Sequence, residues 1–136
     1  MEISVKEISI KKAYTDLEQS KKLAEILSIE SADMEYMFLR KDNSMVNIVP
    51  FIKDGTEEPN GSYTFIHCWS LAALLNVILN LSGNKAVYSF KLVKHRNYWK
   101  CFYENFESII IGECFAYSLV DACYKMILDL HEKNLL

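Results

Sequence analysis

Basic and aromatic side chains alternate along residues 91–103, and these residue types in this pattern could bind a ligand. The candidate contact residues are Lys91, Lys94, His95, Arg96, Tyr98 and Lys100. Lysine and arginine neutralise phosphate groups, and exposed aromatic rings stack on unpaired bases, each contributing ~1–3 kcal/mol. This basic-aromatic hairpin is therefore a candidate surface for single-stranded nucleic acid.

The same residues also fit an ordinary hairpin with one face in water. Along a strand at 98–104 the side chains alternate between two faces. One face holds Trp99, Cys101 and Tyr103, and the other holds Tyr98, Lys100, Phe102 and Glu104. One row has to pack in the core, and the sequence leaves open which row that is.

Cysteine and histidine offer a second kind of chemistry, beginning with the adjacent pair His67 and Cys68. No pair has the C-x₂₋₄-C or H-x₃₋₅-H spacing that brings two ligands to one ion. A nucleophilic cysteine with a histidine base would have to be assembled from distant residues. Because a reduced cysteine packs as a small apolar residue, we expect Cys68, Cys101 and Cys123 to be buried, and Cys114 to lie near a loop. We predict no metal, no cofactor and no catalytic residue.

Acid–base and phosphate chemistry have equally little support. The neighbouring acids Asp33 and Glu35, and the pair Glu57 and Glu58, lack a nearby group that would separate their pKa values, so we expect them to be solvated. The chain has four glycines, and none is in a phosphate-binding arrangement. The expectation is therefore a protein that is not an enzyme.

Length and composition indicate one globular domain over residues 1–136. About half of the residues are hydrophobic and a quarter are charged, as in ordinary folded proteins. A net charge of −3 gives no global attraction to nucleic acid or to an anionic membrane. The first residues are acidic and lack a hydrophobic stretch, and the apolar run at 68–81 is too short to span a bilayer. We expect a cytoplasmic protein with no membrane partner.

The first half of the chain is predicted to form a helix, a hairpin and a second helix. The expected elements are a helix from Thr15, strands at 35–40 and 46–51 with a turn at 41–44, a loop at 53–62 and a central helix at about 67–81. Thr15 and Glu18 have capping-box spacing, which is the reason for the first helix start. Trp69 is expected in the core, with its ring N–H bonded to a carbonyl.

The second half is predicted to form a three-stranded meander and a closing helix. The expected strands are 86–93, 98–104 and 106–111, which are rich in β-branched and aromatic residues. The helix begins near Ser118, and its apolar stripe is Leu119, Ala122, Cys123, Met126, Ile127 and Leu130. The order α-β-β-α-β-β-β-α describes an α+β fold, with helices packed on a small antiparallel sheet made of a hairpin plus a three-stranded meander.

Some of these residues resemble known proteins. The run Cys68-Trp-Ser-Leu-Ala-Ala-Leu-Leu75, with residues 31–34 and 121–127, resembles a family of uncharacterised small proteins encoded by bacterial phages and mobile elements. The layout is also similar to the phage ABA sandwich domain, in which a tryptophan-bearing helix precedes a three-stranded meander and a closing alanine-rich helix. The resemblance covers most of residues 15–131. It implies a prophage or mobile-element origin and a helix–sheet–helix fold, and it implies no activity.

From the sequence we therefore expect a non-enzymatic accessory protein of a prophage or mobile element that acts by protein–protein binding, to a phage or host protein or to itself. The alternative is a single-stranded nucleic-acid-binding module that uses the basic-aromatic hairpin. A small enzyme with a loop-borne site is a third hypothesis, because residues distant in sequence can meet in the fold.

Overall fold

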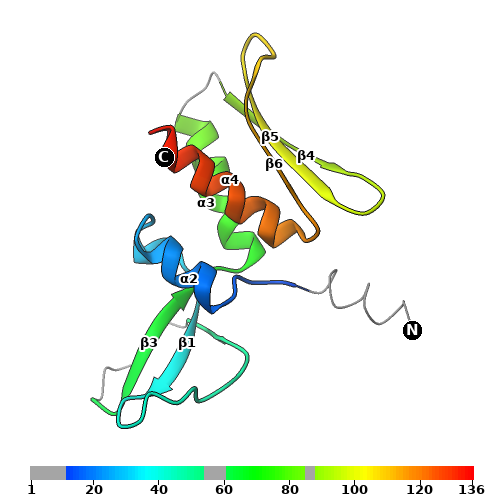
Figure 1. Cartoon of the computed structure of the whole chain (residues 1–136). Helices are drawn as coiled ribbons and strands as arrows, with labels where there is room; N and C mark the ends of the chain where they lie inside the picture. The colour runs from blue at the N-terminus through cyan, green and yellow to red at the C-terminus, as the bar shows by residue number, and fades with distance from the viewer. Residues whose placement is uncertain (1–11, 54–60, 85–87) are drawn as a thin grey trace. The chain divides into compact units, whose positions relative to one another are not determined.

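The structure is a computed structural model that describes residues 12–53, 61–84 and 88–136. These residues form two compact units, Tyr14–Ala73 and Leu74–Leu136, the second joined by Lys12 and Ala13. Each unit contains one three-stranded antiparallel sheet, and helices accompany both (Figure 1). The predicted α+β class is confirmed, with the hairpin and the meander in separate sheets. The prediction of a single domain stays a prediction.

The Tyr14–Ala73 unit combines one helix with a sheet of order β2-β1-β3. Its elements are α2 (Leu17–Ala24), the 3₁₀ helix η1 (Ile29–Ser31), β1 (Met34–Leu39), β2 (Phe51–Ile52) and β3 (Tyr63–Cys68). The middle strand, β1, pairs antiparallel with both neighbours, and α2 contacts β3. Tyr36, Phe38 and Cys68 share one face of the sheet and form a buried cluster there.

The N-cap of α2 lies one residue later than predicted. Asp16 and Gln19 form the capping box, with the Gln19 N–H donating to Asp16 Oδ1 at 2.8 Å and the Asp16 N–H donating to Gln19 Oε1 at 3.0 Å. The predicted cap, Thr15, is fully buried, and its hydroxyl accepts from the Trp69 N–H at 3.2 Å. The Thr15 prediction was wrong because this hydroxyl joins the chain before α2 to the chain before the central helix.

The strand β3 was not predicted, and the central helix, α3 (Leu71–Asn84), begins later than position 67. The Ser70 hydroxyl accepts from the Ala73 N–H at 3.2 Å, and Asp33 Oδ1 accepts from the Ser70 N–H at 2.9 Å. These bonds hold the start of α3 at Ser70, so that the preceding residues pair with β1 instead of continuing the helix. Cys68 is accordingly in a strand and not in a helix.

The predicted strand at 46–51 is confirmed only at its end. Phe51 pairs with Glu35 of β1, whereas residues 46–50 belong to no strand. Pro50 has no N–H for a sheet ladder, which disfavours pairing there. Val46 instead donates its N–H to the Met37 carbonyl at 2.8 Å. The connection between β1 and β2 is consequently longer than the predicted turn.

The Leu74–Leu136 unit contains the predicted meander, in the order β4-β5-β6. Its strands are β4 (Tyr88–Lys94), β5 (Trp99–Asn105) and β6 (Ile110–Ala116), followed by α4 (Leu119–Glu132). On one face of β5, the Tyr103 hydroxyl donates to the Ile78 carbonyl of α3 at 2.6 Å, and the Cys101 thiol donates to the Ala122 carbonyl of α4 at 3.2 Å. Both helices therefore contact this face of the meander.

The third meander strand begins at Ile110 instead of Phe106. The Asn105 side chain accepts from the N–H groups of Glu107 and Ile109, at 2.9 and 3.0 Å. These bonds fold residues 106–109 into a turn, in which Ser108 takes a positive φ of 64°. The predicted strand start was wrong because a side chain of the preceding strand organises the turn.

The closing helix agrees with its prediction. Ser118 is the N-cap of α4, and its hydroxyl accepts from the Asp121 N–H at 3.0 Å. Of the predicted apolar stripe, all members except Leu119 are buried, and Val120 is buried as well. The apolar face of α4 therefore supplies much of the core of this unit.

Candidate functional site

The basic-aromatic hairpin lies on β4 and β5, as the sequence predicted. Lys91 and Lys94 belong to β4, His95 and Arg96 to the connection, and Lys100 to β5. Tyr98 precedes β5 and its ring stacks on the His95 ring, with centroids 4.6 Å apart.

The two rows of β5 have different environments. Cys101 and Tyr103 are fully buried beneath α3 and α4, and Trp99 on the same row is half-buried. Lys100 and Phe102 are half-buried on the opposite row, which we call the outer face of the meander. The Trp99 row therefore faces the core, which answers the question that the sequence left open.

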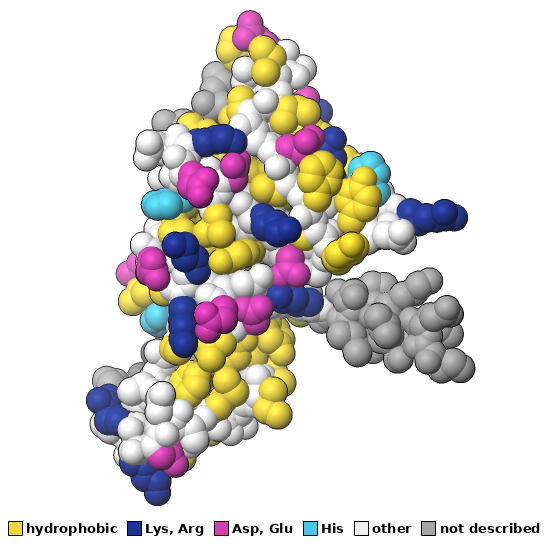
Figure 2. Space-filling view, in the orientation of Figure 1, with side chains coloured by type: hydrophobic (Ala, Val, Ile, Leu, Met, Phe, Trp, Pro, Cys, Tyr) yellow, Lys and Arg dark blue, Asp and Glu magenta, His cyan; other side chains and the backbone are white. Residues whose placement is uncertain are grey.

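Acidic partners balance the lysines of the outer face. Lys91 pairs with Glu104 at 2.8 Å, and Lys100 pairs with Glu113 at 3.0 Å. The Lys100 ammonium also lies 5.1 Å from the Phe102 ring centroid. Figure 2 shows basic and acidic side chains interspersed over the surface that it displays. The basic cluster of the sequence is thus a mixed-charge surface in the fold.

The end of the hairpin keeps a more basic character. Arg96 is exposed, and the Lys94 ammonium lies 5.5 Å from the Trp99 ring centroid while donating to the His95 carbonyl at 2.9 Å. The ring of Tyr98 contacts both the His95 ring and the Phe115 ring of β6. Of the six predicted contact residues, the structure brings together His95, Tyr98 and Lys94, with Arg96 beside them in the connection.

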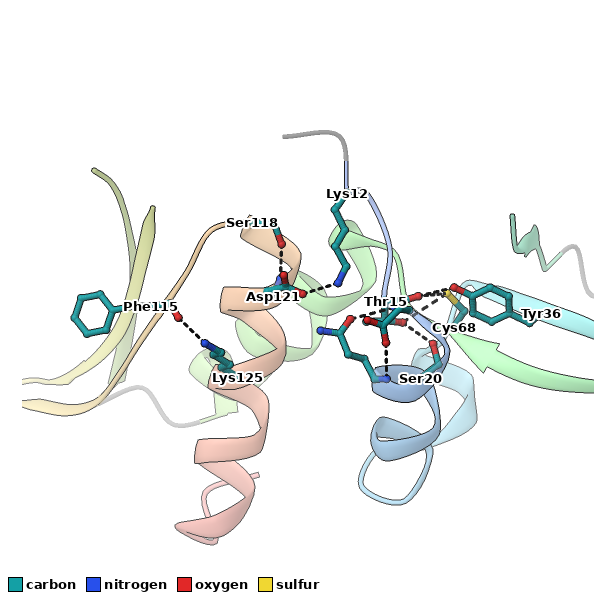
Figure 3. Close-up of polar contacts among 11 residues, drawn as sticks. Lys12, Thr15, Ser20, Tyr36, Cys68, Phe115, Ser118, Asp121 and Lys125 are labelled. Carbon is teal, nitrogen blue, oxygen red and sulfur yellow. Dashed lines mark hydrogen bonds and ion pairs between the residues drawn. The ribbon is translucent and has the colours of Figure 1, made fainter. Parts of the chain in front are cut away.

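Lysines of α4 cover the far edge of the meander. Lys125 Nζ donates to the Phe115 carbonyl at 2.9 Å, and Lys133 Nζ donates to the Ile111 carbonyl at 2.8 Å (Figure 3 shows the Lys125 contact). Lys133 also pairs with Asp129 at 2.6 Å. A Cβ at Gly112 would lie 2.6 Å from Asp129 Oδ2, so the glycine leaves room for this pair against β6. Sequence reasoning missed these contacts.

The thiols are held in their neutral form. All four cysteines are free, and burial raises the pKa of each, for Cys123 to about 12. Cys68, Cys101 and Cys123 are buried as predicted, whereas Cys114 lies half-buried inside β6 and not near a loop. A thiol with a raised pKa is a poor nucleophile at neutral pH.

The Cys68 thiol belongs to a buried network around Thr15 (Figure 3). The Thr15 hydroxyl lies 2.8 Å from Ser20 Oγ, and the Thr15 carbonyl accepts from the Tyr36 hydroxyl at 2.8 Å and from the Cys68 thiol at 3.4 Å. Burial raises the pKa of Tyr36 above its usual value. Because successive strand residues point to opposite faces, His67 lies on the other face of the sheet from Cys68. The network ties α2 to β1 and β3.

The sequence predicted solvated carboxylates at Asp33 and Glu35, and this prediction was wrong. Asp33 accepts from the N–H and the hydroxyl of Ser70, and Glu35 is 5% exposed. Glu35 lies opposite His67 in the register of β1 and β3, and His67 Nδ1 lies 3.3 Å from Lys53 Nζ. Glu57 and Glu58 lie outside the described residues. Asp33 therefore has a structural role, at the start of α3.

Trp69 is fully buried, as predicted for a core residue. Its ring N–H donates to the Ser31 hydroxyl at 2.9 Å and not to a carbonyl. Among the described residues, no group of three or more histidine, cysteine or acidic side chains is placed to hold a metal ion. No helix within these residues has the length and apolar character needed to cross a bilayer.

Large apolar side chains are exposed on the connection between β1 and β2. We call residues 45–52 the apolar segment; its exposed members are Met45, Val46, Ile48, Val49 and Ile52. Ile48 is 88% exposed and Ile52 is 77% exposed. Figure 2 shows hydrophobic side chains gathered over this part of the molecule. Sequence reasoning assigned residues 46–51 to a strand, and the proline at position 50 was the signal that could have corrected this assignment.

Searches against protein-family models, curated proteins and solved structures returned no match for this chain.

Proposed function

We propose that this chain is a non-enzymatic accessory protein that acts by binding another protein. The observation that carries the proposal is the apolar segment, in which five large apolar side chains are exposed within eight consecutive residues, 45–52. Contiguous exposed apolar side chains are typical of protein-binding surfaces.

The free energy available at this segment is substantial. Fully burying one isoleucine side chain contributes about 1.5–3 kcal/mol. Ile48 and Ile52 are the most exposed of the set, so a partner that covers both gains several kcal/mol before its own losses of freedom are subtracted. Pro50 is buried between them and limits the conformations of the segment, which lowers the entropy cost of ordering it.

The partner that we propose is a phage or host protein. This part of the proposal rests on the resemblance of residues 68–75, 31–34 and 121–127 to proteins of phages and mobile elements. The raised pKa values of the thiols agree with a protein that does not use cysteine as a nucleophile.

Affinity capture with quantitative mass spectrometry tests the proposal. Ile48→Asp places a charge on the most exposed apolar residue, and we expect it to remove the captured partner. Asn47→Asp adds the same charge to the adjacent polar position and should retain the partner. Capture that is unchanged by Ile48→Asp, or a monomer that captures nothing from host or phage lysate, contradicts protein binding through this segment.

The second candidate function is binding of single-stranded nucleic acid at the end of the hairpin. The stacked rings of His95 and Tyr98, with the exposed Arg96, favour it. Lys94→Glu or Arg96→Glu should then weaken binding of a labelled oligonucleotide, and added salt should weaken it further because counterions are released on binding. Binding that neither substitution changes removes this candidate.

A further inference from the structure

β4 is an edge strand of the meander. Within the described residues, β4 has β5 as its only strand neighbour. An edge strand presents unpaired N–H and C=O groups that a further strand can use. The β4 edge is therefore a place where another chain can extend the sheet.

The positions of the unpaired groups follow from the ladder. His95 donates its N–H to the Tyr98 carbonyl at 2.9 Å, and bonded and non-bonded pairs alternate along an antiparallel ladder. Val93 and Lys91 therefore bond to β5, while the N–H and C=O groups of Leu92 and Phe90 point away from it. On the opposite edge, the lysine-bound carbonyls belong to Ile111 and Phe115, which are four residues apart, an even spacing that agrees with this alternation.

The side chains of β4 indicate the chemistry of the added strand. Phe90 and Leu92 are half-buried on the core-facing row, whereas the Lys91 side chain is 55% exposed on the outer face. The described strand contains two lysines, Lys91 and Lys94, and no acid of its own, while Lys91 pairs with Glu104 of β5 at 2.8 Å and remains 55% exposed. Because side chains directly opposite each other share one face, a matching strand carries apolar residues opposite Phe90 and Leu92 and an acid opposite Lys91.

A second copy of β4 is a poorer match. In a two-fold antiparallel pair, the register that places Phe90 opposite Leu92 of the other copy also places Lys91 opposite Lys91. Like charges directly opposite are destabilising. Lysine on an edge strand also discourages pairing between identical edges. The charge pattern therefore favours a different, acidic partner.

We propose that the β4 edge binds an extended apolar–acidic–apolar segment of a partner protein, which adds to the meander as a fourth strand. This inference rests on the proposed protein-binding function and gives it a second contact surface, in addition to the apolar segment. Backbone hydrogen bonds to Phe90 and Leu92 supply the attachment, and Lys91 supplies the preference for an acid.

A labelled short peptide that alternates glutamate and valine is the probe, and fluorescence anisotropy is the measurement. A matched peptide of lysine and valine is the charge control. Leu92→Pro removes an outward N–H without removing a bond to β5, since proline is tolerated on an edge. We expect it to weaken binding of the glutamate peptide at least ~10-fold. Leu92→Ala keeps the N–H, and binding should change less than ~3-fold.

Lys91→Glu provides a second variant that leaves the backbone intact, and it should reverse the preference toward the lysine peptide. The proposal is overturned if the glutamate peptide does not bind, if both peptides bind the wild-type protein equally, or if neither Leu92→Pro nor Lys91→Glu alters binding. A concentration-dependent dimer that Leu92→Pro abolishes would assign the edge to a second copy instead. A natural partner lost with Ile48→Asp but retained with Leu92→Pro leaves protein binding standing and removes the β4 edge.

Discussion

The two edges of the meander differ in what the described residues place beside them. At β6, α4 lies alongside, and two of its lysines donate to strand carbonyls, at Phe115 and Ile111. At β4, the described residues supply no strand neighbour other than β5. Among the residues that the structure describes, this sheet thus has one covered edge, at β6, and one edge without a further strand, at β4.

The difference shows that the β6 edge is protected by a helix, α4, and not by the strand itself. The side chains of β6 include Gly112, which lets the Asp129–Lys133 pair approach the backbone. When one edge of a sheet is covered, a further strand can be added only at the opposite edge. The comparison between the edges can be tested in four ways.

The largest effect is expected in the core beneath the covered edge. Met126 of α4 is fully buried, and Met126→Ala should lower the free energy of unfolding by about 2–5 kcal/mol, because it removes buried contacts and leaves a cavity. Val93→Ala on β4, where the side chain is 38% exposed, should cost less than ~1 kcal/mol. Urea unfolding measures both. Equal losses would show that the two edges do not differ in packing.

The next effect is a dependence on pH. Burial raises the Cys123 pKa from 9.0 to about 12, so the unfolded chain loses this proton at lower pH than the folded protein. The thiol's contribution is fully present below pH 9.0 and is lost as the pH rises toward about 12, at about 1.4 kcal/mol per pH unit. Unfolding measured across this range should show a smaller slope for Cys123→Ala. An unchanged slope contradicts the assignment.

Removal of the lysines that cover β6 should have an intermediate effect. Lys125→Met and Lys133→Met each remove a donor to a strand carbonyl and should each cost about 1 kcal/mol. Lys22→Met is the control, since Lys22 pairs with Glu25 at 3.8 Å on the exposed side of α2. The double variant should also self-associate, which light scattering detects, because its β6 edge is no longer covered. A monomeric double variant would mean that the lysines do not protect this edge.

The smallest effect is expected for the ion pair at the open edge. Lys91 is 55% exposed, so its coupling to Glu104 should be less than ~1 kcal/mol and should fall with added salt. A double-mutant cycle of Lys91→Met and Glu104→Gln measures this coupling. A larger, salt-insensitive value would show that Lys91 is committed to Glu104 and is not available to a partner.

The sequence predicted the parts of the fold that depend on local signals. The Ser118 cap and the apolar stripe of α4 lie within one continuous stretch, and the meander strands are rich in residues that favour sheets. β3 escaped prediction because its first five residues are half-buried on both faces, so that no alternation is visible. The start of β6 depends on one side chain, Asn105, which the pattern does not reveal.

The candidate site was predictable in its residues but not in its charge. Lys91 and Lys100 were found from the sequence, whereas their acidic partners, Glu104 and Glu113, are assigned only by the register of three strands. The apolar segment was missed for a related reason. An apolar run predicts burial, and only its tertiary surroundings show that Ile48 and Ile52 remain exposed.

The pairing of Thr15 with Trp69 has a consequence for the time course of folding. These residues are 54 positions apart, and closing a long loop costs more entropy than forming neighbouring strands. The meander and α4 connect elements that follow one another in the chain, which favours early formation. Refolding should therefore begin in the Leu74–Leu136 unit, and amide protection at Trp69 should appear last, when the two ends of the other unit meet.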